Sequence, residues 1–187
     1  LNASGYGSWP YILAIDFNDD NEVAYGGDAI NVVYGNTDDE TSISMSNRNP
    51  ADNSEIHLTI TDPALNIDPT TADLWKFDLS DTAFDSSSAI LQTNGTNAVL
   101  DAEEMGQGGF VSNGQLRANI ETVLATGANT VSAVIMTESG ANTGVFESFD
   151  INGNGQFETI EGAAADTQVI FSYGGNSVDM IITYNDA

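Results

Sequence analysis

The sequence predicts an all-β fold, an antiparallel β-sandwich, from three observations. Many short segments alternate apolar and polar residues, as half-buried strands do. Clusters of Gly, Asn and Asp separate these segments, which is typical of turns between antiparallel strands. Only one stretch has helical spacing instead. With 187 residues the chain is long enough to bury a core, and we expect one module over residues 1–187.

The clearest strand is EIHLTIT (55–61), in which Ile56, Leu58 and Ile60 alternate with polar residues. The same pattern predicts strands at residues 10–16, 29–35, 41–46, 73–79, 130–136, 143–149, 166–173 and 177–184. Between the last two, YGGNSV (173–178) is typical of a tight hairpin turn.

One stretch, about 81–128, interrupts this rhythm, and we interpret it as an insertion with a further short strand pair. Part of it follows the helical period through Leu116, Ile120, Val123 and Leu124. Ser112 and Gln115 are spaced as a capping box, and Gly127 is a typical helix end. The insertion is therefore expected to carry one short α-helix over 113–126.

The charge of the chain is extreme. It has 28 acidic residues against Arg48, Lys76 and Arg117, a formal net charge of −25. Nucleic acid is excluded as a partner, because phosphate binding needs clustered Lys and Arg. Self-repulsion of this size destabilises a compact state unless cations neutralise it. We therefore expect small cations among the partners.

The chain has no cysteine, which excludes disulfides and thiolate metal sites. No apolar run approaches the roughly 18 residues of a membrane span, so we expect no direct membrane insertion from this segment. The chain starts at LNASGYGSWP without a signal-peptide pattern. We expect it to be a fragment of a longer, multi-module chain.

A calcium-loop pattern lies at FDINGNGQFETIEG (149–162). Its residues match D-x-[DN]-x-[DN]-G-x5-E at Asp150, Asn152, Asn154, Gly155 and Glu161. The carbonyl of Gln156 and the side chain of Glu158, directly or through water, complete the expected ligand set. Predicted strands flank the loop, so it links strands rather than helices. Two interpretations stand: a calcium site, or an Asn-Gly turn whose polar side chains bond their own backbone.

A looser copy of the pattern is DFNDDNEVAYGGD (16–28). Asp16, Asn18 and Asp20 occupy the first three ligand positions. The position of the bidentate carboxylate holds a glycine, so Glu22 or Asp28 has to stand in. Two related loops on strand connections make calcium more credible than either alone, because a hard cation needs six to eight oxygen ligands.

Two further motifs carry a resemblance to a known family. The first is a strand that ends in TDPALNIDP, with matches at Thr61, Asp62, Pro63, Leu65, Asn66, Asp68 and Pro69. In this motif Asp68 is placed to cap a single helical turn that starts at Pro69. The second is TESGANTGVFE, with matches at Thr137, Glu138, Gly140 and the residues 142–147. Together they resemble the repeats of archaeal surface-layer (S-layer) proteins, closest to those of ammonia-oxidising archaea.

That resemblance implies an immunoglobulin-like version of the antiparallel β-sandwich. It also implies a secreted protein at the cell surface, where copies and neighbouring modules assemble into a two-dimensional lattice that is calcium-dependent and glycosylated. The sequons NAS at Asn2 and NGT at Asn94 agree with a glycoprotein. Ammonium is the cation that an acidic layer on such a cell is expected to gather.

Other function classes have less support. The single histidine, His57, has no cysteine or second histidine to join it, and no G-x-S-x-G motif is present. Paired carboxylates leave a glycoside-hydrolase dyad open, but Trp9 and Trp75 are the only tryptophans available as sugar platforms. We assign no catalytic residue and expect no enzyme. The alternative is a calcium-dependent adhesin or other secreted binding module, with the same sandwich and a ligand-reading tip.

Overall fold

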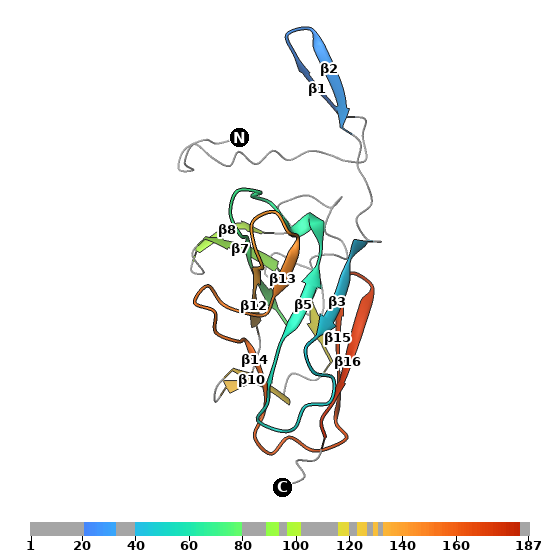
Figure 1. The fold of residues 1–187 in the computed structure, drawn as a ribbon, viewed down its shortest axis with the longest axis vertical. Helices are drawn as coiled ribbons and strands as arrows, with labels where there is room; N and C mark the ends of the chain where they lie inside the picture. The colour runs from blue at the N-terminus through green and yellow to red at the C-terminus, as the bar shows by residue number, and fades with distance from the viewer. Residues whose placement is uncertain are drawn as a thin grey trace.

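The computed structural model describes residues 21–32, 40–79, 89–93, 97–101, 116–119, 123–126, 129–130 and 133–183 (Figure 1). Within these ranges the chain is all-β and every strand pair is antiparallel. The part of the chain that is described contains no α-helix, and its 3₁₀ turn η2 (Pro63–Leu65) follows the strand β5. The predicted fold class is thus confirmed at the level of an antiparallel all-β protein.

The largest sheet has seven strands in the order β3-β5-β13-β12-β6-β7-β8. Their bounds are β3 (Ser42–Met45), β5 (Leu58–Thr61), β13 (Val145–Glu147), β12 (Ala133–Glu138), β6 (Leu74–Asp78), β7 (Ala89–Thr93) and β8 (Asn97–Asp101). The pair β7–β8 is the short strand pair expected within residues 81–128, and it extends the sheet beyond β6.

Three smaller sheets accompany it. One has the order β16 (Asn176–Ile181), β15 (Gln168–Tyr173), β9 (Arg117–Ala118). Another has the order β11 (Asn129–Thr130), β10 (Leu124–Thr126), β14 (Phe157–Thr159), β4 (Glu55–Ile56). The third is a hairpin of β1 (Asn21–Tyr25) and β2 (Asp28–Val32), which stands apart from the other sheets in Figure 1.

The core lies between sheets, as in a sandwich. Alternate residues of β12 and β15 are buried, so each sheet turns one apolar face inward. Phe77 from the seven-stranded sheet meets Tyr173 from the three-stranded sheet edge-on, with ring centroids 6.0 Å apart. Phe157 of the four-stranded sheet meets Phe171 in the same way at 5.6 Å. One apolar cluster therefore joins the three sheets.

The predicted strand 55–61 is divided at His57, where the chain passes from the four-stranded to the seven-stranded sheet. Serine hydroxyls replace the missing ladder bonds at this point. The hydroxyl of Ser46 accepts from the backbone N–H of His57 at 2.9 Å, and that of Ser148 accepts from Leu58 N–H at 2.9 Å. The two sheets thus separate here without losing backbone hydrogen bonds.

The helix predicted over 113–126 is wrong in the residues that the structure describes. Residues Arg117–Ala118 form β9, and Leu124–Thr126 form β10. Leu116 directly precedes β9 and Leu124 begins β10, so these two buried residues belong to two different sheets and their helical spacing does not describe one element. Pairing with the neighbouring strands β15 and β14 fixes these strands. Ser112, Gln115, Ile120 and Gly127 lie outside the described residues, as does the strand predicted at 10–16.

Candidate calcium loop and buried carboxylates

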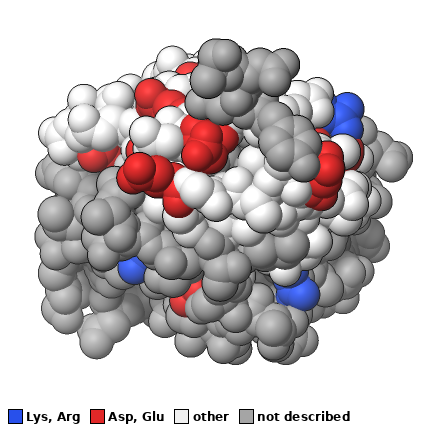
Figure 2. Space-filling model, turned by 90° about the horizontal axis from the view of Figure 1, so that it is seen from below, with Lys and Arg blue, Asp and Glu red and all other residues white. Residues whose placement is uncertain are grey.

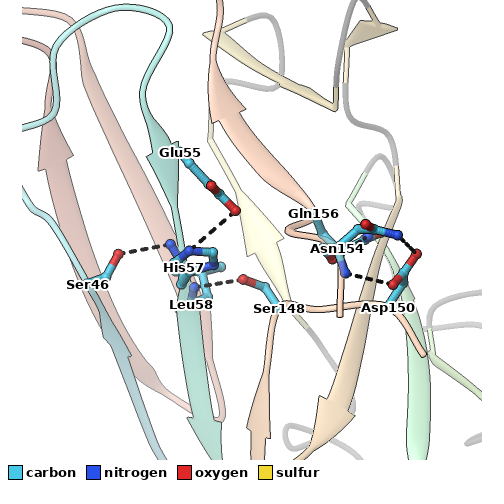
Figure 3. Close-up of polar contacts among 8 residues, drawn as sticks. All are labelled: Ser46, Glu55, His57, Leu58, Ser148, Asp150, Asn154 and Gln156. Carbon is cyan, nitrogen blue, oxygen red and sulfur yellow. Dashed lines mark hydrogen bonds and ion pairs between the residues drawn. The ribbon is translucent and has the colours of Figure 1, made fainter. Parts of the chain in front are cut away.

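The calcium pattern at residues 150–154 forms the tip of a connection between β13 and β14 (Figure 3). Phe149 and Gly155 pair across its base. At the tip, Oδ1 of Asp150 accepts from the backbone N–H groups of Asn152 at 2.8 Å and Asn154 at 2.9 Å. Its Oδ2 accepts from the side-chain amide of Asn154 at 3.0 Å. These hydrogen bonds, first that of the Asn154 side chain, lower the pKa of Asp150, which keeps its carboxylate charged.

The other expected ligands of this loop lie differently. The side-chain amide of Gln156 donates to the carbonyl of Asn154 at 3.3 Å, at the edge of the tip. Glu158 lies in β14, which leads away from the tip, and Glu161 follows it. Glu161 is six positions beyond Gly155, and because β14 between them is extended, about 15 Å or more of chain separates the two residues. The structure therefore brings Asp150, Asn152 and Asn154 together but leaves Glu161 apart from them.

The second predicted loop is described only in part. Asp16, Asn18 and Asp20 lie outside the described residues. Glu22 pairs with Asn31 and Asp28 with Tyr25, so the two-residue period of strands puts Glu22 and Asp28 on opposite faces of the hairpin. The two carboxylates cannot serve the same ion. The predicted glycosylation sites Asn2 and Asn94 also lie outside the described residues.

Among the described residues, no three carboxylate, histidine or cysteine side chains gather as they do around a metal ion. Apart from Asp62, Asp73 and Glu138, the acidic side chains whose burial the structure describes are exposed or partly exposed. In Figure 2 they collect on part of one face, while the few basic side chains lie apart from one another.

The two motifs that carry the family resemblance meet in space, beside a buried glutamate of the second motif. Glu138 ends β12 and is 3% exposed. Its Oε1 accepts from the backbone N–H groups of Thr143 at 2.7 Å and Gly144 at 2.8 Å, and its Oε2 accepts from Asp73 N–H at 3.0 Å. Asp62 N–H in turn donates to the carbonyl of Gly144 at 2.8 Å. Glu138 thus ties the turn after β12 to the segment before β6.

A second carboxylate, Asp73, continues the same network. Its Oδ2 accepts from the N–H groups of Ile67 at 2.5 Å and Asp68 at 3.1 Å. Burial raises the pKa of Asp73 to about 6 against the lowering effect of these bonds, and the charge of Glu138 raises it further. Sequence reasoning placed Asp73 only at the start of a strand. Its partners depend on the register of β6 against β12, which no local pattern reveals.

The third carboxylate, Asp62, is fully buried. Its Oδ1 caps η2 by accepting from Ala64 N–H at 2.8 Å, and its Oδ2 accepts from the hydroxyl of Tyr173 at 2.5 Å. Burial and the Asp62 charge raise the pKa of Tyr173, which keeps its hydroxyl protonated. The cap-and-proline pattern expected at Asp68–Pro69 appears as a turn, with Asp68 Oδ1 accepting from Thr70 N–H at 2.9 Å. We call Asp62, Asp73 and Glu138 the buried carboxylates.

No protein-family model matches the sequence, and no curated protein matches it. The resemblance to surface-layer repeats therefore rests on the two motifs themselves. Within the described ranges, no helix has the length and apolar character needed to cross a membrane.

Proposed function

We propose that this chain is a structural module of an archaeal surface layer, an immunoglobulin-like sandwich that assembles with copies of itself and neighbouring modules outside the cell. The direct contact between the two motifs carries this proposal: Asp62 N–H donates to the carbonyl of Gly144, and the side-chain amide of Asn66 donates to Oδ1 of Asn142. The motif residues close one end of the sandwich by bonding backbone N–H groups of separate turns. A module that is repeated as a building block has to meet its neighbours in the same way each time, so it needs an end with a fixed structure.

Calcium is the proposed stabilising ion, and the tip at Asp150 is its proposed binding site. Asp150 is ionised and exposed there, next to amide oxygens of the kind that calcium prefers. Because the chain has a net charge of −25, its folded state needs counter-ions to reduce self-repulsion. An ion that binds only the folded state stabilises it by about 2.7 kcal/mol at a hundredfold excess over its Kd.

Calcium titration of the purified protein tests both parts of the proposal. The two measurements are the melting temperature and the formation of two-dimensional lattice sheets in electron micrographs. Both should rise with calcium. Asp150→Asn keeps one oxygen for the N–H groups of Asn152 and Asn154 but removes the charge, and it should abolish most of the rise in melting temperature. Glu161→Gln is the matched control, since Glu161 lies away from the tip. Calcium-independent melting rejects the ion site, and an absence of sheets under all conditions rejects the surface-layer module. Glycan binding without sheets would favour an adhesin.

The acidic surface is proposed to gather small cations, ammonium among them, at the cell boundary. Charge of one sign lining the pores of a lattice raises the local concentration of counter-ions by 10-fold or more at low salt. At 0.15 M salt the screening length is about 8 Å, so the pores have to be narrow. Ammonium partitioning into assembled sheets, before and after amidation of the carboxylates, measures the effect. Equal ammonium partitioning before and after amidation would mean that the acidic side chains serve only solvation and calcium binding.

A further inference from the structure

The hairpin β1–β2 carries an apolar face that no other part of the described chain covers. Val23 pairs with Ile30 and Tyr25 with Asp28, so these four side chains share one face. Val23 is 55% exposed, Tyr25 91% and Ile30 68%. A two-stranded hairpin is marginal in water by itself and needs a third strand or a packing surface. This face therefore calls for a partner.

A second uncovered apolar surface lies on the outside of the sheet β9–β15–β16. Gln168 pairs with Ile181 and Ile170 with Asp179, while the residues between them point into the core. Ile170 is 37% exposed and Ile181 36%. The two isoleucines are diagonal neighbours on adjacent strands, which is close enough for one contact patch.

The same outer face holds most of the basic residues of the chain. Arg48 donates to the carbonyl of Asp179 at 3.0 Å and also pairs with its carboxylate. Arg117 of β9 pairs in register with Ser172, which faces outward with Ile170. Two of the 3 basic residues in a chain with 28 acidic ones are thus on this sheet face. Because Arg48 is paired with Asp179 on the β16 side of this face, Arg117 on the β9 side is the group that would attract an acidic partner.

We propose that the apolar face of β1–β2 docks on the outer face of β9–β15–β16 in a second copy of this chain. Val23, Tyr25 and Ile30 cover Ile170 and Ile181, while Asp28 meets Arg117 on the β9 side of the face. A hairpin-to-hairpin contact is disfavoured, because it places the Asp28 carboxylates of both copies in one interface. A contact between different surfaces is heterologous and continues from copy to copy. The inference rests on the proposed function and names the contact by which the module would propagate.

Thiol crosslinking of the full chain tests this contact, because the protein has no cysteine of its own. Chains with Tyr25→Cys are mixed with chains with Ile170→Cys under assembling conditions and treated with a short bismaleimide. A Tyr25→Cys and Ala141→Cys mixture is the control, since Ala141 is exposed but lies in the turn between β12 and β13. We expect at least about tenfold more crosslinked dimer in the first mixture.

Three results would overturn the proposal: equal yields in both mixtures, a comparable yield from Tyr25→Cys chains alone, or closure within one chain that carries both thiols. If two-dimensional lattice sheets form without the 25–170 crosslink, this contact is rejected and the surface-layer proposal still stands. An absence of sheets rejects the surface-layer proposal itself, and the contact with it.

A second measurement follows self-association by sedimentation. Tyr25→Ser with Ile30→Ser should weaken it about tenfold or more, as loss of buried anchor residues does, and Ala141→Ser, at an exposed residue between β12 and β13, should not. The hairpin contributes nothing to the core cluster, so the melting temperature of the body should stay unchanged in both variants. Unchanged association in the hairpin variant contradicts the proposal.

Discussion

A single hydrogen bond joins Tyr173 of the three-stranded sheet to Asp62 beside the seven-stranded sheet, at 2.5 Å. Both residues are buried. Tyr173→Phe removes the donor to a buried carboxylate and should lower the free energy of unfolding by about 1–3 kcal/mol. Thermal and urea unfolding measure the loss, and Tyr25→Phe, at an exposed tyrosine, is the matched control. Equal stability of the wild type and Tyr173→Phe would contradict a role for this bond.

The raised pKa of Asp73 predicts how the free energy of unfolding depends on pH. Its pKa is about 6 in the folded chain and 3.8 as a free group. The folded state therefore binds a proton more tightly, and the contribution of Asp73 to stability is complete below pH 3.8 and lost as the pH rises through about 6. Between pH 7 and pH 5, protonation of Asp73 should raise the free energy of unfolding by on the order of 1 kcal/mol. This figure allows for solvent, which screens part of the shift in pKa.

Comparison with Asp73→Asn tests this effect, since the variant lacks the Asp73 carboxyl and keeps every other acidic residue. The asparagine oxygen still accepts from Ile67 and Asp68, so the turn should remain folded. Melting curves at pH 7, 6 and 5 should show a smaller rise on acidification in the variant. Parallel curves for the two proteins would mean that Asp73 titrates normally.

At the scale of elements, strands could be predicted wherever one face is buried and the other is not. The segments around β3, β6, β12 and β15 show this alternation in the sequence and in the burial of the structure. The division of 55–61 at His57 could not be predicted, because it depends on serines that come from distant strands. The helix prediction failed for a related reason: Leu116 and Leu124 have helical spacing, but pairing with distant strands places them in two different sheets.

The candidate site shows the same limit. The sequence pattern placed Asp150, Asn152 and Asn154 correctly in one tip, since these residues bond within a few positions. Glu161 belongs to the same pattern, but β14 carries it away by pairing with β4 and β10. The buried carboxylates are joined through pairings between distant strands, which local patterns do not contain.

The turn between β12 and β13 depends on Gly144, which has a φ of +61°. A Cβ at this position would lie 3.2 Å from Cα of Pro63, so the backbone of Pro63 would have to shift by a few tenths of an ångström. Gly153 has a φ of +80° with open space around it. Gly153→Ala should therefore cost about 1 kcal/mol for the left-handed backbone alone, and Gly144→Ala at least about 1 kcal/mol more. Urea unfolding of both variants measures the difference, and equal losses would show that the contact with Pro63 relaxes.

For the whole molecule, the net charge of −25 sets the dependence on salt. The folded chain holds its carboxylates closer together than the unfolded chain does, so their repulsion lowers the free energy of unfolding. Screening lengths fall from about 30 Å at 0.01 M salt to about 8 Å at 0.15 M. The melting temperature should therefore rise steadily with sodium chloride.

Calcium chloride at equal ionic strength should raise the melting temperature further, because ions held at the 150–154 tip add to general screening. Asp150→Asn separates the two effects. It removes one acidic charge of 28, so the sodium chloride curve should be nearly unchanged while the extra rise in calcium disappears. A melting temperature that is independent of sodium chloride would mean that the acidic charges repel no more in the folded chain than in the unfolded one. An extra calcium rise that survives Asp150→Asn would place the bound ions elsewhere on the acidic surface.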